Sequence, residues 1–221
     1  MKSLNGDRKI RCVIYDCDGV LFDSLEVNRR FYNHFRTTLG RPPLTEDELR
    51  YAHTHTVHEA IHFLFRNDPN LEEKALGLLS RVDSQETIAH LKMEPNLLPA
   101  LNRLKERGVH RAVSTNRSTN MKSILERFGL ELYFDLVITA RDVQNPKPHP
   151  ESIQRILQTL GLKREEAVFI GDSEIDRQTA ASAGVGFIAY KNKEITADAF
   201  IDDHLAILNF IPGGENYGNE S

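Results

Sequence analysis

Residues 11–24 read R-C-V-I-Y-D-C-D-G-V-L-F-D-S and join a short apolar run to a pair of acidic residues. The run from Cys12 to Tyr15 is β-branched and aromatic and is bounded by charge, which is typical of a buried strand. On an extended segment alternate side chains point the same way, so Asp16 and Asp18 face one side and Cys17 the other. The stretch therefore predicts a strand with two converging carboxylates at its carboxyl end.

Similar apolar runs recur along the chain and define the fold class. They are residues 111–114, 136–139, 167–170 and 186–190, with a weaker run at 199–201. Segments with helical periodicity lie between them, and a glycine follows the last apolar residue of three such segments, where a left-handed residue would end a helix. These glycines are Gly108, Gly129 and Gly161. The alternation predicts an α/β fold, a doubly wound and mostly parallel sheet with helices on both faces.

One part of the chain breaks this alternation. Residues 24–91 show helical periodicity without a credible strand, and Thr45 followed by Glu48 has the spacing of a capping box. We therefore expect a small all-helical cap domain over residues 24–91, inserted after the first strand. Residues 1–23 and 92–221 then form the Rossmann-like core.

Composition excludes several classes of protein. A chain of 221 residues with 40% hydrophobic content can bury a core, and its 28 basic and 32 acidic residues are scattered, which argues against a nucleic-acid partner. No run approaches the roughly 18 apolar residues of a membrane-spanning helix. The two cysteines, Cys12 and Cys17, are too few for a disulfide framework, so we expect a cytoplasmic protein that does not bind membranes.

Polar residues follow several of the predicted strands. Two carboxylates as close as Asp16 and Asp18 favour a cation between them, which suggests Mg²⁺ with oxygen ligands, although D-x-D-G alone fits a solvated turn equally well. The other strand ends supply hydroxyls, an amide, a lysine between two prolines and further acids. In order these are Ser114, Thr115, Asn116, Lys147, Asp172 and Asp176. This set suits phosphoryl transfer through an aspartyl-phosphate.

Two of these side chains, and the cysteine between the paired acids, also have a purely structural interpretation. Ser114 fits a buried strand residue better than a ligand. Asp176 either supports the site or caps the helix that follows it. Cys17 points away from both acids, which favours a structural thiol over a catalytic one.

Four motifs, D-C-D-G-V-L-F-D-S, V-S-T-N, the lysine of P-K-P-H-P-E, and G-D-S-E-I-D, resemble in order those of the haloacid dehalogenase superfamily. The resemblance spans roughly residues 11–189. It is strongest to the phosphoglycolate phosphatase and β-phosphoglucomutase-like branch, whose helical cap is inserted after the first motif.

The resemblance implies a role for each residue of the acidic pair. Asp16 would attack phosphorus, and Asp18 would protonate the leaving oxygen and later deprotonate water, which needs their pKa values to be separated. Mg²⁺ would be held by Asp16, the Asp18 backbone carbonyl and Asp172, with Asp176 supporting them from behind. Phosphate would contact Thr115, Asn116 and Lys147, of which Thr115 and Lys147 also serve catalysis.

The expected function is a Mg²⁺-dependent phosphatase acting on a small phosphorylated metabolite, with phosphoglycolate as the default. A sugar phosphomutase shares the covalent intermediate and stays open, as does a catalytically silent phospho-ligand binder. The chain is expected to be a monomer or a homodimer. Five residues of the cap are candidates for substrate contact, namely Asn28, Arg29, Tyr32, His53 and His55.

The cap also contains a zinc-protease spacing, His58-Glu59-x-x-His62. A catalytic zinc needs a third protein ligand, which the following sequence does not supply in the usual position. A helix that packs Ile61 inward and exposes histidines is favoured instead. A third interpretation places some of His53, His55 and His58 over the catalytic strand ends, where they would contact substrate.

Overall fold

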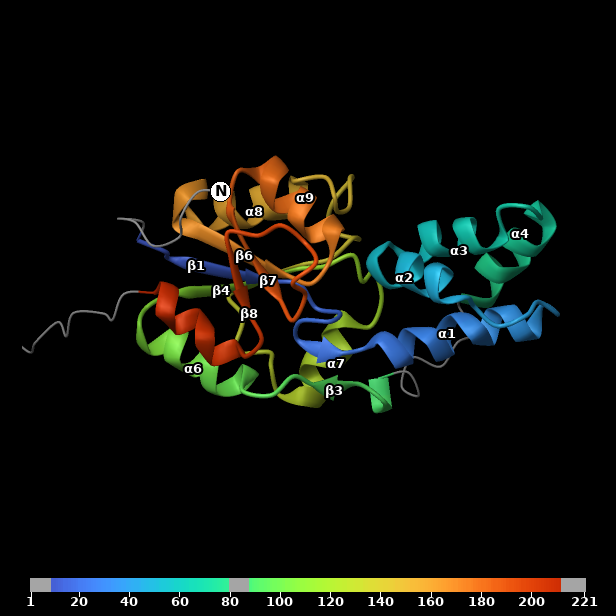
Figure 1. The fold of residues 1–221 in the computed structure, drawn as a ribbon, viewed down its shortest axis with the longest axis horizontal. Coiled ribbons are helices and arrows are strands. Elements are labelled where there is room, and N and C mark those ends of the chain that lie inside the picture. Colours follow the sequence, from blue (N-terminus) through green and yellow to red (C-terminus); the bar gives the residue numbers. More distant parts are fainter. Residues whose placement is uncertain (1–8, 80–87, 212–221) are drawn as a thin grey trace, which may run out of the picture.

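The computed structural model describes residues 9–79 and 88–211 (Figure 1). Its main sheet has six strands in the order β5-β4-β1-β6-β7-β8, and every neighbouring pair is parallel. The strands are β1 (Cys12–Tyr15), β4 (His110–Ser114), β5 (Leu136–Ile138), β6 (Ala167–Gly171), β7 (Gly186–Tyr190) and β8 (Ala199–Ile201). All six predicted strands are present, and the predicted fold class is confirmed.

Helices cover both faces of this sheet (Figure 1). Val13 and Tyr15 of β1 belong to the apolar cluster that includes α6 (Leu97–Glu106), α7 (Met121–Phe128) and the 3₁₀ helix η3 (His204–Phe210). Cys12 and Ile14 point to the opposite cluster, formed with α8 (Glu151–Leu160) and α9 (Glu174–Ala183). A short 3₁₀ helix, η2 (Arg164–Glu166), precedes β6. Because both faces of β1 are buried, the strand reads as a continuous apolar run.

Glycines end the helices as their positions in the sequence predict. Gly129 and Gly161 are the C-caps of α7 and α8 and have φ values of 65° and 63°. Gly108 follows α6 with a φ of 67°. A side chain with a Cβ would be strained in this left-handed conformation.

The cap consists of α1 (Leu25–Thr38), α2 (Glu46–Thr54), α3 (Val57–Phe65) and α4 (Pro69–Leu78). It has its own apolar cluster, which includes Phe35, Ile61 and Leu64. The predicted capping box is present, because the Thr45 side chain accepts from the Glu48 N–H and the Glu48 side chain accepts from the Thr45 N–H. Figure 1 shows these helices as a separate lobe beside the sheet.

Two short strands join the cap to the core. β2 (Phe22–Asp23) and β3 (Lys92–Met93) pair antiparallel, one before the cap and one after it. Two residues are too few to show a strand periodicity, so this pair could not be predicted from the pattern of residues. The predicted cap boundaries fall next to it, but residues 80–87 lie outside the described part of the chain, and the boundaries stay a prediction.

No helix in the described ranges is long and apolar enough to cross a membrane.

Candidate active site

The site lies where the strand order of the sheet reverses. From β1 the chain first builds β4 and β5 on one side, then crosses to β6, β7 and β8 on the other. Crevices at such a reversal, outside the carboxyl ends of the strands, are where open α/β sheets bind ligands. Asp16 follows β1, Thr115 follows β4 and Asp172 follows β6, so three separate motifs meet at this point.

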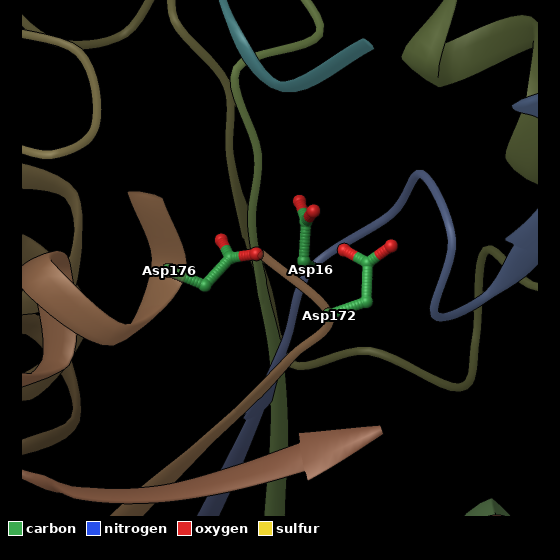
Figure 2. A group of neighbouring side chains, drawn as sticks. All are labelled: Asp16, Asp172 and Asp176. Carbon is green, nitrogen blue, oxygen red and sulfur yellow. The ribbon is translucent and has the colours of Figure 1, made fainter. Parts of the chain in front are cut away.

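Three aspartates form an acidic cluster at this edge (Figure 2). One ligand atom from each of Asp16, Asp172 and Asp176 lies within 4.8 Å of the others. Burial raises the pKa of Asp16 to about 7 against the opposing effect of Lys147, and Asp176 and Asp18 add to the rise. Burial, followed by Asp176 and Asp16, raises the pKa of Asp172 well above its usual value. The cluster holds more negative charge than the protein compensates, which is the environment of a divalent cation with oxygen ligands.

Two glycines allow the carboxylates to approach the backbone this closely. A Cβ on Gly19, which has a φ of 77°, would lie 2.0 Å from Asp172 Oδ2. A Cβ on Gly171 would lie 2.3 Å from the Cβ of Asp176. The positions of Asp172 and Asp176 therefore depend on the absence of side chains at these two positions. Oxygen donors, excess negative charge and this close backbone packing all fit a Mg²⁺ site.

Lys147 lies buried between two of these acids. Its Nζ is 2.8 Å from Asp16 Oδ1 and 2.6 Å from Asp176 Oδ1. Burial lowers the pKa of an ammonium, but Asp16 and Asp176 outweigh it and raise the pKa of Lys147. The lysine therefore places a positive charge beside Asp16.

Asp176 combines the two interpretations that the sequence left open. It completes a capping box at the start of α9, where its side chain accepts from the Ser173 N–H and Ser173 Oγ accepts from its own N–H. Its other carboxylate oxygen binds Lys147. The residue thus fixes the helix and the lysine together.

Asn116 connects the lysine loop to the cap. Its Oδ1 accepts from the Lys147 N–H at 3.0 Å, and its Nδ2 donates to the Lys147 carbonyl at 3.0 Å and to the Thr54 carbonyl at 3.1 Å. The amide is therefore engaged with protein groups on both sides. This arrangement favours a positioning role over the direct phosphate contact expected from the sequence.

The remaining motif residues are buried at the same edge. Thr115 is buried and its Oγ1 accepts from the Arg117 N–H at 3.1 Å. Ser114 Oγ lies 2.7 Å from Ser152 Oγ inside the core, in keeping with a structural residue. Burial, followed by Asp18, raises the pKa of the Cys17 thiol well above its usual value, which disfavours the reactive thiolate.

Asp18 has a partner that the sequence reasoning missed. Arg117 Nε lies 3.1 Å from Asp18 Oδ2, and Nη2 lies 2.5 Å from Oδ1. Burial would raise the pKa of Asp18, but the charge and hydrogen bonds of Arg117 outweigh it and lower the pKa to about 2. The two acids of the pair are separated in pKa, as the expected mechanism requires, but the lower value belongs to the expected acid. The sequence shows only an arginine two residues after Thr115, which does not identify Asp18 as its partner.

Residues of the cap and of the core together line a cavity at the site. This cavity of about 60 Å³ is lined by core residues such as Asp16 and Lys147 and by cap residues. Of the five candidate cap residues, Asn28, Tyr32, His53 and His55 line this cavity. Arg29 does not line it and instead pairs with Glu46 and Glu26 on the cap surface.

The zinc-protease spacing serves helix structure instead. Glu59 completes a capping box with Thr56, and its side chain accepts from the Thr56 N–H at 2.9 Å. His58 is exposed, and the exposed His62 lies 2.9 Å from Glu72. Within residues 9–79 and 88–211, the aspartate cluster is the only group of three or more His, Cys, Asp or Glu side chains that could hold a metal ion.

Comparisons with known proteins give a consistent result. The sequence model of the family described as haloacid dehalogenase-like hydrolase matches residues 13–190. A phosphoglycolate phosphatase of Rhodobacter capsulatus is 30% identical over 80% of this chain and 83% of its own. Pyrophosphatase PpaX of Halalkalibacterium halodurans is 28% identical over 80% of this chain and 81% of its own. A crystal structure of a HAD-superfamily hydrolase, subfamily IA, variant 1, from Geobacter sulfurreducens is 40% identical, with a TM-score of 0.79 over 91% of this chain and all of that one.

Proposed function

Because the chain belongs to the haloacid dehalogenase-like hydrolases, we propose that it is a Mg²⁺-dependent phosphatase that hydrolyses a small phosphomonoester through an aspartyl-phosphate. The observation that carries the proposal is the contact of Asp16 with Lys147 at 2.8 Å beside the cluster with Asp172. The end of β1 is thus surrounded by the Asp16 carboxylate, the Lys147 ammonium and the carboxylate oxygens of the aspartate cluster. We assign the cap to residues 24–91 and the core to residues 1–23 and 92–221, for which the β2–β3 pair is the support.

In the first step Asp16 attacks phosphorus, the bond to the leaving oxygen breaks, and Asp18 gives that oxygen its proton. Thr115 and Lys147 bind the phosphoryl oxygens, and Lys147 offsets the charge that develops in the transition state. A Mg²⁺ ion held by Asp16, Asp172 and the Asp18 carbonyl would lower the repulsion between the incoming phosphate and the carboxylates. Asp176 and Asn116 hold Lys147 in place during this step.

In the second step Asp18 takes a proton from water, and the water oxygen attacks phosphorus. The bond between phosphorus and the Asp16 oxygen breaks, which releases inorganic phosphate and restores the Asp16 carboxylate. As a carboxylate paired with Arg117, Asp18 is already in the form that this step needs. In the first step it must carry a proton, so we infer that its contact with Arg117 loosens when substrate binds. Hydrolysis and not transfer is the proposed outcome, and a phosphomutase would reveal itself by an isomerised product.

The proposed substrate class is a small phosphorylated metabolite, with phosphoglycolate as the first candidate. The cavity of about 60 Å³ supports a small substrate. Two relatives are named for phosphoglycolate and for pyrophosphate, and both of these compounds are small. The two free, buried cysteines, Cys12 and Cys17, favour a cytoplasmic location, and monomer or homodimer remains the expected state.

The test is release of inorganic phosphate from a panel of small esters, with Mg²⁺ and then with EDTA. Wild type should release phosphate only with the metal, and Asp16→Asn should lower turnover by at least about 10³-fold, because covalent catalysis is lost. Asp23→Asn makes the same change at an exposed site of the same segment and serves as the control. Full activity in a folded Asp16→Asn protein would overturn the proposal.

A further inference from the structure

Arg117 has hydrogen-bond donors that the protein does not use. A guanidinium carries five N–H groups in a planar fork. Nε and Nη2 are directed at the two oxygens of Asp18. Across residues 9–79 and 88–211, no acceptor lies within hydrogen-bonding distance of Nη1. The edge formed by Nη1 and the second Nη2 hydrogen is therefore open.

This open edge belongs to a side chain that solvent hardly reaches. The Arg117 side chain is 9% exposed, and the residue lines the same cavity as Asp16, Lys147 and His53. Nη1 is not among the fully buried polar atoms that lack a partner, so it remains accessible and an anion in the cavity could form a charge-assisted hydrogen bond with it. An occupant of the cavity is thus the group best placed to satisfy it.

A second donor without a partner lies next to the arginine. The Ser118 hydroxyl is buried, has no hydrogen-bond partner in the described structure, and belongs to a residue that lines the cavity. Helix α7 begins three residues later, and its N-cap, Asn120, makes no side-chain capping bond. Asn120 also lines the cavity, so the positive N-terminal end of the α7 dipole lies at this side of it.

The charges in the cavity leave room for a further anion. Its two lining carboxylates, Asp16 and Asp18, are each paired, with Lys147 and Arg117 respectively. An anionic group at the free edge of Arg117 would therefore not meet an unpaired carboxylate. The geometry of that edge, two parallel N–H groups, matches the two oxygens of a carboxylate or a phosphate.

We propose that Arg117, assisted by Ser118, is a specificity-determining residue that binds a second anionic group of the substrate, in addition to the phosphoryl group that is transferred. The inference rests on the proposed phosphatase function and names its substrate class: a phosphomonoester or anhydride with a carboxylate or a further phosphate a short distance from the reacting phosphorus. An arginine that only holds Asp18 would affect all esters alike.

The experiment compares two esters that differ only in charge, phosphoglycolate and its neutral amide, phosphoglycolamide. Wild type should prefer the carboxylate by at least about 30-fold in kcat/KM, and Arg117→Gln should reduce that preference to within about threefold of unity. Arg117→Lys, which keeps the charge and loses the fork, should retain part of it. Ser118→Ala should lower the preference by about threefold. Pyrophosphate, measured in parallel, distinguishes a carboxylate handle from a phosphate handle.

The control is Arg29→Gln, an arginine of the cap that is paired with carboxylates and does not line the cavity. It should leave the preference unchanged. Equal kcat/KM for both esters and for pyrophosphate in wild type would overturn the inference, as would equal losses on both esters in Arg117→Gln. If Arg117→Gln does not fold, the wild-type preference and Arg117→Lys decide. Absence of phosphate release from every ester would instead overturn the proposed function itself.

Discussion

The acidic cluster of the core and the histidine-rich helix of the cap both place titratable side chains at short, motif-like spacing, yet they differ in burial. Asp16 is buried at the end of β1, whereas His58 and His62 lie exposed on α3. The core residues converge from separate strand ends, whereas those of the cap share one helix. A motif-like spacing therefore indicates a site only where the fold packs other elements against it and excludes water.

The two regions also differ in how their charges are satisfied. Glu59 of the cap is exposed, and its Oε2 accepts from the Thr56 N–H and hydroxyl in the capping box. In the core, burial and mutual repulsion raise the pKa values of Asp16 and Asp172 despite the nearby Lys147. Excess charge of one sign in a buried cluster is costly for stability unless a ligand compensates it. An added cation would therefore offset the excess negative charge of the core cluster. The capping box of the cap helix shows no such excess.

Of the variants that test this contrast, replacement of Asp172 should have the largest effect on activity and on the Mg²⁺ requirement, because it alters the acidic cluster directly. Asp172→Asn removes a charged oxygen donor, so we expect activity at limiting Mg²⁺ to fall by at least about 100-fold and the Mg²⁺ requirement to rise. Because the raised pKa of Asp172 reflects unfavourable charge burial, the same variant should unfold at a higher temperature than wild type in EDTA. Phosphate release against Mg²⁺ concentration and thermal unfolding measure the two effects.

Asp202→Asn, at an exposed position, is the matched control and should change neither quantity. An unchanged Mg²⁺ requirement in Asp172→Asn would remove Asp172 from the metal site. A lower unfolding temperature in EDTA would mean that the cluster is not electrostatically strained.

Loss of Asn116 tests the connection between the two regions. Asn116→Ala removes the bonds to both backbone groups of Lys147 and to the Thr54 carbonyl of the cap. We expect kcat to fall by about 10- to 100-fold, because a small displacement of a charge that stabilises the transition state is costly. The Mg²⁺ requirement should not change, which separates this variant from Asp172→Asn. A rise in KM alone would instead favour the direct phosphate contact expected from the sequence.

Much of the core was predictable from sequence because parallel strands, buried on both faces, give apolar runs that end in polar motifs. The family, the fold class and a hydrolase of the phosphatase kind are confirmed. The Arg117 contact with Asp18 was not predictable, because the two residues are far apart in sequence and belong to different motifs. The β2–β3 pair was missed because two-residue strands have no periodicity. Residue roles at the site remain predictions that the variants test.

Buried and exposed histidines should respond differently to acid. His204 is buried in the core, donates from Nε2 to the Val20 carbonyl and stacks on Tyr190 at 4.5 Å. Burial lowers its pKa from 6.5 to about 4. The unfolded chain then binds more protons between these values, so stability is complete above pH 6.5 and falls towards pH 4, by about 3 kcal/mol.

Urea unfolding of wild type and His204→Phe from pH 7.5 to 4 measures this contribution. The phenylalanine preserves an aromatic ring but cannot titrate, so the difference between the two proteins should shrink as the pH falls. His58→Phe, at an exposed position of the cap, is the control for the change from histidine to phenylalanine itself. A constant difference between wild type and His204→Phe would show that His204 does not titrate on unfolding.

Removal of His58 should have the smallest effect on activity and stability. It tests whether the histidine-rich cap helix takes part in catalysis or metal binding. The side chain is exposed, does not line the cavity and has no place in a metal cluster of the described residues. We expect His58→Ala to keep phosphatase activity within about twofold and stability within about 0.5 kcal/mol, as for surface substitutions in general. Metal content of the purified protein provides the second readout, with no stoichiometric zinc in wild type or variant. If wild type contained zinc, and if His58→Ala lost both the zinc and the activity, the cap helix would be a metal site.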